Sequence, residues 1–122
     1  EKAQELSKEI HKKTGTNCTA SALSQDVNAD IIINTTSLGM KGDKENQTPI
    51  ESKALHPGTT VMDIVYNPLE TKLLKDAKEA GCTTIDGVGM FVNQGALALE
   101  KWTNKKVPRK IMRDAVMKSL NG

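Results

Sequence analysis

Short apolar runs alternate with longer amphipathic stretches along the whole chain. Runs rich in β-branched residues at 30–34, 59–66 and 82–85 predict three strands, and a shorter strand is predicted at 18–20. The run Asp-Ile-Ile-Ile-Asn at 30–34 is continuous rather than alternating, which is typical of a parallel strand buried on both faces. The polar segment 21–28 predicts a turn with a helical fragment.

Four other segments repeat apolar residues at the spacing of one helix face. They cover residues 1–14, 70–80, 88–102 and 108–120. Gly15 and Gly81 follow the first two segments, and a glycine there is a common signal for the end of a helix. Because strands and helices alternate, and because the strands are β-branched, the chain predicts an α/β fold with a Rossmann-like, doubly wound parallel sheet.

Three polar or glycine-containing motifs follow the three main strands directly. They occupy residues 35–40, 66–68 and 86–89. Parallel strands end at the same edge of a sheet, and ligands of such sheets bind there, so we expect the motifs to converge on one site. A polar loop at 41–49, which we expect to be mobile, follows the first motif.

The turn Gly87-Val88-Gly89 stands where the third strand ends and a long helix begins. A glycine turn at this point lets a ligand approach bare backbone, and the unpaired N–H groups favour acceptors and anions. Gln94 follows one to two turns later on the same helix, so it can face the same pocket. Taken alone, a Gly-x-Gly pair also fits a tight strand-to-helix turn that binds nothing.

The composition narrows the classes of function. The 122 residues suffice for one domain or part of one, and with only 2% aromatic residues the core is expected to be aliphatic. The net charge of +2, without a basic patch interleaved with aromatic residues, gives nucleic-acid binding no support. No apolar run approaches about 18 residues, so no membrane span is expected.

The metal-ligating residue types are sparse. Cys18 and Cys82 lie far apart and lack the spacing of a metal site, so we expect reduced thiols in a cytosolic protein and no metal. His11 lies on a charged helix and His56 precedes a proline in a turn, so both are expected at the surface.

Together the motifs resemble the C-terminal half of shikimate dehydrogenase, over nearly the whole chain. The segments that carry the resemblance are 30–40 (Asp-Ile-Ile-Ile-Asn-Thr-Thr-Ser-Leu-Gly-Met), 61–71 (Val-Met-Asp-Ile-Val-Tyr-Asn-Pro-Leu-Glu-Thr) and 86–96 (Asp-Gly-Val-Gly-Met-Phe-Val-Asn-Gln-Gly-Ala). The resemblance implies an NADP-binding domain of a cytoplasmic enzyme that reduces 3-dehydroshikimate to shikimate, on the route to chorismate and the aromatic amino acids. The partners expected are shikimate and 3-dehydroshikimate in the whole enzyme, with no nucleic acid or membrane partner, and a homodimer is left open.

The resemblance also assigns cofactor-binding residues. Thr36 and Ser37 match positions that line NADP near its pyrophosphate and ribose. Ile64 matches a position that packs on the cofactor, and Gly87 and Met90 match positions around the nicotinamide. These residue types suit the roles, because hydroxyl groups can bond phosphate or ribose oxygens and an apolar side chain excludes water from the nicotinamide. The alternative for Thr36 and Ser37 is that they cap a turn.

Three further residues receive roles from the resemblance. Tyr66 matches a tyrosine that contacts shikimate, and Gln94 matches a glutamine that hydrogen-bonds a substrate hydroxyl. Lys2 replaces the second arginine of a motif that grips the adenosine 2′-phosphate; its ammonium can attract the phosphate but cannot bind it with two parallel bonds. Alternatively, Tyr66 is a half-buried packing residue and Gln94 satisfies a backbone group.

Other parts of the family's pattern are absent from this sequence. It has no Gly-x-Gly-x-x-Gly/Ala turn after a first strand and no motif with the family's catalytic Lys and Asp. We therefore expect residues 1–122 to be the C-terminal part of the NADP-binding domain, without its first two strands, without the substrate domain and without catalytic residues. By itself it should not oxidise shikimate. The other hypotheses are a quinate/shikimate dehydrogenase segment and a non-catalytic nucleotide-binding module.

Overall fold

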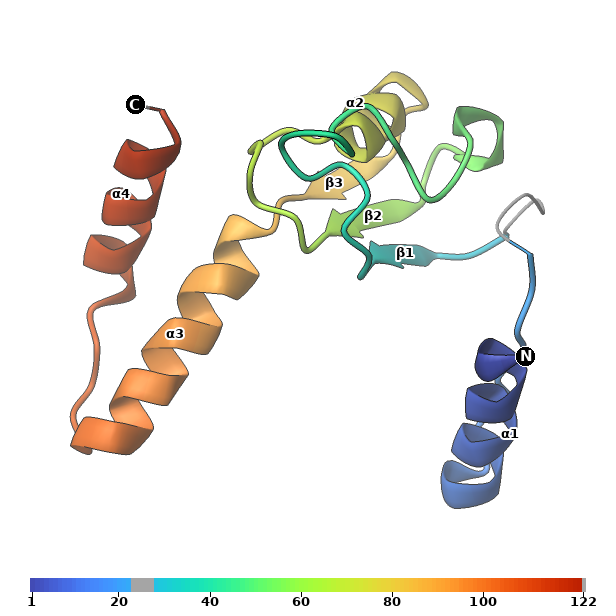
Figure 1. Cartoon of the computed structure of the whole chain (residues 1–122), viewed down its shortest axis with the longest axis horizontal. Helices are drawn as coiled ribbons and strands as arrows, with labels where there is room; N and C mark the ends of the chain where they lie inside the picture. Colours follow the sequence, from blue (N-terminus) through green and yellow to red (C-terminus); the bar gives the residue numbers. More distant parts are fainter. Residues whose placement is uncertain (23–27, 122) are drawn as a thin grey trace.

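Three short strands form a parallel sheet in the order β1-β2-β3 in the computed structural model, which describes residues 1–22 and 28–121 (Figure 1). The strands are β1 (Ile31–Asn34), β2 (Thr60–Asp63) and β3 (Thr83–Ile85). Asn34 lies opposite Asp63, and Met62 lies opposite Ile85, so the carboxyl ends of the strands share one edge. The three main strands of the sequence analysis and their parallel pairing are confirmed.

The helices also lie where the periodicity predicts them. They are α1 (Lys2–Thr14), the short 3-10 helix η1 (Ser52–Ala54), α2 (Lys72–Glu79), α3 (Val88–Thr103) and α4 (Arg109–Leu120). Gly15 and Gly81 have positive φ angles of 71° and 79°, which favours glycine at both positions. Residues 41–49 contain neither helix nor strand, as predicted for a loop. Among the described residues, none of the helices is long and apolar enough to cross a membrane.

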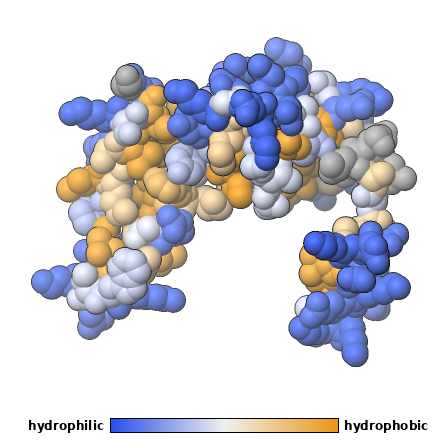
Figure 2. Space-filling view, in the orientation of Figure 1, coloured by the Kyte–Doolittle hydropathy of each residue, from blue (hydrophilic) through white to orange (hydrophobic). Residues whose placement is uncertain are grey.

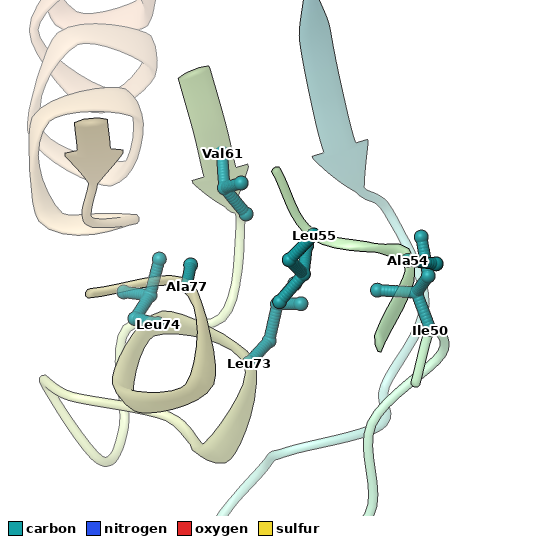
Figure 3. Close-up of a cluster of buried hydrophobic side chains, with 7 residues drawn as sticks. All are labelled: Ile50, Ala54, Leu55, Val61, Leu73, Leu74 and Ala77. Carbon is teal, nitrogen blue, oxygen red and sulfur yellow. The ribbon is translucent and has the colours of Figure 1, made fainter. Parts of the chain in front are cut away.

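One face of the sheet carries the hydrophobic core. Side chains of β2, α2 and the segment around η1 meet there, and Figure 3 shows them converging between the sheet and α2. The core residues are Ile50, Ala54, Leu55, Val61, Leu73, Leu74 and Ala77. All are aliphatic, as the low aromatic content predicts. Burial of these side chains holds α2 against the strands and so fixes the edge where the strands end.

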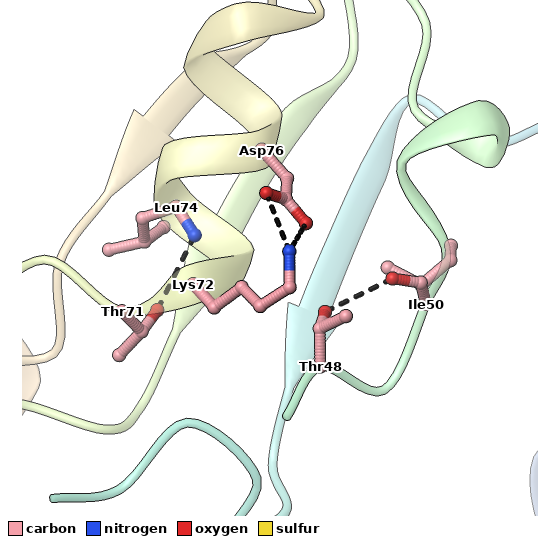
Figure 4. Close-up of polar contacts among 6 residues, drawn as sticks. All are labelled: Thr48, Ile50, Thr71, Lys72, Leu74 and Asp76. Atoms are coloured by element: carbon pink, nitrogen blue, oxygen red, sulfur yellow. Dashed lines mark hydrogen bonds and ion pairs between the residues drawn. The ribbon is translucent and has the colours of Figure 1, made fainter. Parts of the chain in front are cut away.

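The N-terminus of α2 is closed by a side-chain cap. Thr71 precedes the helix, and its hydroxyl accepts a hydrogen bond from the backbone N–H of Leu74 (3.4 Å; Figure 4). Lys72, the first residue of α2, pairs with Asp76 one turn further along the helix (2.7 Å; Figure 4). In the loop before η1, the Thr48 hydroxyl donates to the carbonyl of Ile50 (3.0 Å; Figure 4). Ile50 is the first core residue of this segment.

The opposite face of the sheet is open, so the expectation that 30–34 is buried on both faces is wrong for this chain. Ile31 is 62% exposed and Ile33 53% exposed, and Ile85 on the same face is 45% exposed. Within the described residues α2 and η1 cover the other face. The β-branched run correctly predicts a parallel strand, but burial depends on what lies over each face, which the run itself does not encode.

The strand predicted at 18–20 is also wrong, because these residues form no regular structure. A strand needs a neighbour for its backbone polar groups. Here the carbonyl of Cys18 accepts a hydrogen bond from the Ser7 hydroxyl of α1 instead (2.6 Å). The turn predicted at 21–28 falls mostly on residues 23–27, which lie outside the described part of the chain.

Helix α1 stands apart from the sheet (Figure 1). It contacts no other helix or strand among the described residues. Its surface is largely hydrophilic, with a hydrophobic patch on one side (Figure 2), and Leu6 is 57% exposed. Cys18, which follows the helix, and Cys82 are both free thiols, in agreement with the expectation of reduced cysteines.

Helices α3 and α4 pack against each other beside the sheet (Figure 1). Their connection is held by Glu100, which accepts hydrogen bonds from the backbone of Val107 (3.0 Å) and from both terminal nitrogens of Arg109 (3.1 and 3.2 Å). The Val107 hydrogen bond and then the Arg109 guanidinium lower the pKa of the Glu100 carboxyl from its usual value. The carboxylate thus links the end of α3 to the beginning of α4.

Candidate cofactor site

A cavity of about 680 Å³ opens at the carboxyl edge of the sheet. It is formed by the loop after β1, the segment after β2 and the beginning of α3. The lining residues are Thr35, Thr36, Ser37, Met40, Lys41, Ile64, Val65, Tyr66, Asn67 and Met90. Its size lies in the range of small-molecule and cofactor sites, and its lining is mostly apolar with a few polar groups, as such sites require.

The cavity brings together five of the residues predicted from the sequence. They are Thr36, Ser37, Ile64, Tyr66 and Met90. They come from three segments that are distant in the sequence, and parallel pairing of the strands brings these segments to one edge of the sheet. Two of the three motifs, 35–40 and 66–68, thus line one cavity as expected, whereas none of residues 86–89 lines it. The individual roles of the residues stay predictions.

Stacking of two aromatic rings fixes one side of the cavity. The rings of Tyr66 and Phe91 stack with centroids 4.2 Å apart and planes 22° from parallel. Phe91 lies one residue after Met90 in the first turn of α3, so the stack links the segment after β2 to that helix. Tyr66 thus has the packing role considered as its alternative, and it also lines the cavity.

The two hydroxyl residues of the loop after β1 differ in what they offer a ligand. The Thr36 hydroxyl donates to Oδ1 of Asn34 (2.8 Å) and accepts from the N–H of Leu38 (3.2 Å), so it holds the turn. The Ser37 hydroxyl accepts a hydrogen bond from Nζ of Lys44 (2.7 Å), and its own hydrogen remains available for a ligand oxygen.

A network of buried hydrogen bonds fixes the loop after β1. Nδ2 of Asn34 donates to the carbonyl of Leu38 (3.1 Å) and to Oδ1 of Asp63 (3.0 Å). The Asp63 carboxylate also accepts from the N–H of Val65 (3.0 Å) and from the Thr71 hydroxyl (2.7 Å). Asp63 and Thr71 are fully buried and Asn34 nearly so. The network thereby joins the loop after β1 and the segment after β2, which form two walls of the cavity, to Thr71 at the cap of α2.

Sequence reasoning missed this network, although a signal was present. Asp63 is the one carboxylate in the apolar run 59–66, and Asn34 ends the isoleucine run of β1. Polar residues in such runs are buried with them and must find partners. Within the described residues no buried side-chain nitrogen or oxygen lacks a hydrogen bond, so these groups are fully satisfied.

Gly87 lies beside the cavity rather than in its lining. A Cβ atom on Gly87 would stand 2.5 Å from the Ile64 oxygen and 2.7 Å from the Val65 oxygen. Its φ of −75° is open to any residue, so the close backbone approach, and not the conformation, requires glycine here. Gly87 therefore lets the beginning of α3 lie directly against the cavity wall formed by Ile64 and Val65.

Two predicted residues lie outside the cavity. Gln94 is exposed on α3, where its side-chain amide donates to the carbonyl of Phe91 (2.9 Å), as its alternative role proposed. Lys2 is exposed on α1, which stands apart from the sheet. The described residues contain no group of three or more His, Cys, Asp or Glu placed to hold a metal ion.

The parallel sheet, with a largely apolar cavity at its carboxyl edge, defines part of an α/β domain of the kind that binds dinucleotides. The comparisons with known proteins agree with the motif resemblance. Residues 87–117 match the family model described as the shikimate 5'-dehydrogenase C-terminal domain. The motif resemblance to shikimate dehydrogenase is therefore confirmed.

Individual relatives extend this match over nearly the whole chain. The NADP(+) shikimate dehydrogenase of Methanococcus aeolicus is 50% identical over 90 residues, which are 74% of this chain and 32% of that protein. The Methanopyrus kandleri enzyme of the same name is 36% identical over 98% of this chain and 43% of its own length. A crystal structure of a shikimate dehydrogenase in complex with NADP+ superposes with a TM-score of 0.91 at 38% identity, covering 98% of this chain and 43% of that one.

Proposed function

We propose that residues 1–122 form the C-terminal part of the NADP-binding domain of a shikimate dehydrogenase. The chain spans 32% and 43% of the two relatives described above, so the substrate domain and the catalytic groups are assigned to the rest of the enzyme. The observation that carries the proposal is the cavity, because it gathers five residues expected to contact NADP or shikimate. The free thiols of Cys18 and Cys82 fit a cytoplasmic enzyme.

The lining of the cavity fits the nicotinamide end of NADP. Ile64 and Met90 offer apolar surface to a flat ring, and Tyr66 adds an aromatic face with a hydroxyl at its tip. When bound in the whole enzyme, NADPH would supply the hydride that reduces the carbonyl of 3-dehydroshikimate. The contribution of these side chains is to orient the ring and to keep water from the reacting carbon.

Gln94 is proposed to contact the substrate from α3. Its amide is exposed and bonded only within its own helix, so a change of rotamer frees it for a ligand hydroxyl. In the whole enzyme we expect Gln94→Ala to raise KM for shikimate about tenfold, because one lost hydrogen bond to a buried partner costs about 1–3 kcal/mol. KM for NADP should change far less. Steady-state kinetics with each substrate varied in turn measures both constants.

Two further variants complete this experiment, one as a control and one as a milder test of substrate contact. Asn93→Ala removes the neighbouring exposed amide, which borders the small cavity between α3 and α4, and should leave both constants unchanged. Tyr66→Phe keeps the ring stack and removes only the hydroxyl, so it should give a milder rise in KM for shikimate. If Gln94→Ala altered KM for NADP and left that for shikimate untouched, the substrate role of Gln94 would be wrong.

A further inference from the structure

The cavity carries positive charge and no negative charge. Lys41 is the one charged residue among those that line it, and no carboxylate is among them. The backbone N–H of Lys41 donates to the carbonyl of Asn67 (2.9 Å), so the lysine is anchored between the two loops that form the cavity. A ligand that fills this site should therefore combine a flat apolar part with an anionic part.

A second lysine stands at the rim of the same cavity. Nζ of Lys44 donates to the hydroxyl of Ser37 (2.7 Å), and Ser37 belongs to the lining. The loop that carries Lys44 is closed by a backbone hydrogen bond from Gly39 to the Lys44 carbonyl (2.9 Å). Gly39 in turn lies against Thr71, since a Cβ atom there would stand 3.3 Å from that side chain. The ammonium group is thus placed by a loop that contacts the cap of α2.

Neither lysine of the cavity is neutralised. In the described part of the chain, no carboxylate lies within ion-pair distance of Lys41 or Lys44, whereas Lys53, Lys72 and Lys110 each pair with one. Asp43 and Glu45 flank Lys44 in the sequence, but neither forms an ion pair with it, and Glu45 accepts from the backbone N–H of Gly42 within its own turn. The Lys44 ammonium retains two N–H donors beyond its bond to Ser37, and these are free for an anion.

We propose that Lys44 and Ser37 together bind a phosphate group of the dinucleotide, with Lys41 adding positive charge from the cavity lining. The inference rests on the proposed function, because it names the residues that hold the phosphate of the ligand assigned there. The Ser37 hydroxyl accepts from Lys44 and donates to a phosphate oxygen, and the ammonium bonds a second oxygen of the same group. The sequence lacks the Gly-x-Gly-x-x-Gly/Ala turn that holds the phosphates in dinucleotide-binding folds.

Binding measurements on the chain test the assignment with three probes. NADP and nicotinamide mononucleotide carry phosphate, and nicotinamide riboside does not. We expect Lys44→Ala to weaken binding of both phosphate-bearing probes about tenfold, as for loss of one charge-assisted hydrogen bond, and to leave the riboside unchanged. Lys44→Arg should restore most of the affinity, since it keeps the charge. Lys53→Ala, which removes an exposed lysine paired with Glu51, is the matched control and should have no effect.

The outcomes separate the two proposals. If Lys44→Ala binds NADP and the mononucleotide as tightly as the unmodified chain, the phosphate role of Lys44 is overturned while the cofactor site stands. An equal loss for all three probes also contradicts it, because the effect would then not depend on phosphate. If the unmodified chain binds none of the three, the proposed function fails and the lysine assignment fails with it.

Discussion

Replacement of Asp63 by alanine is expected to lower the free energy of unfolding by about 3–5 kcal/mol. The carboxylate is fully buried and accepts hydrogen bonds from Asn34, Val65 and Thr71. Its removal leaves three buried donors without an acceptor, and each unsatisfied group costs about 1–3 kcal/mol. A loss of this size is a large fraction of the stability of a small domain. Urea denaturation followed by circular dichroism measures it.

A surface aspartate provides the matched control for this experiment. Asp114 pairs with Lys110 one helical turn away on α4, and its side chain is 62% exposed. Asp114→Ala should change the free energy of unfolding by less than about 0.5 kcal/mol, because exposed pairs of this spacing contribute little. Equal effects of the two substitutions would show that the Asp63 network does not hold the cavity walls together.

Gly87→Ala is expected to lower the free energy of unfolding by about 1–3 kcal/mol, the usual range for overpacking. The added methyl group would stand 2.5 Å from the Ile64 oxygen, so the beginning of α3 must move away from the cavity wall. Because Met90 lies on that first turn and lines the cavity, KM for NADP in the whole enzyme should rise more than KM for shikimate. Urea denaturation and steady-state kinetics measure the two effects.

The glycine two residues later is the control. A Cβ atom on Gly89 would meet nothing within 4 Å, and the residue lies inside the first turn of α3. Gly89→Ala should therefore leave cofactor use unchanged and stabilise the chain by up to about 1 kcal/mol, because alanine favours the helix. If Gly87→Ala behaved like Gly89→Ala, the close approach to Ile64 would have no role in the site.

Much of the fold is predictable because local patterns are sufficient for it. The isoleucine run before Asn34 and the apolar run that contains Asp63 are β-branched, and a helix of regular apolar spacing lies between β2 and β3. Parallel pairing then follows from the alternation, and it places the residues after each strand at one edge. The cavity formed by Ser37, Ile64 and Met90 could be foreseen from the sequence for this reason.

The rest depends on contacts that no local pattern encodes. Ile31 and Ile33 are exposed because nothing among the described residues covers their face of the sheet. Residues 18–20 have strand-like side chains but no neighbouring strand, and the Cys18 carbonyl bonds to α1 instead. Sequence pattern thus predicts what an element is, whereas its burial depends on residues far away in the chain.

In the site, too, local pattern predicts the element, whereas its contacts depend on distant residues. The glycine motif predicts a turn at Gly87, but the reason for the glycine, contact with the Ile64 backbone, is visible only in three dimensions. The hydrogen bonds of Asp63 to Asn34 and Thr71 join three separate segments. No single segment predicts them. The roles of Gln94 and Lys2, which lie outside the cavity, stay predictions from family resemblance.

Methionine methyl groups test the central claim, that the cavity receives the nicotinamide end of NADP. Met40 and Met90 line the cavity, whereas Met112 and Met117 lie on α4 outside it. In a titration of the methyl-labelled chain with NADP, followed by NMR, we expect saturable chemical-shift changes at Met40 and Met90, and none at the two methionines of α4. Shifts confined to α4, or no shift at Met40 and Met90 at the highest soluble concentration of NADP, would contradict the account.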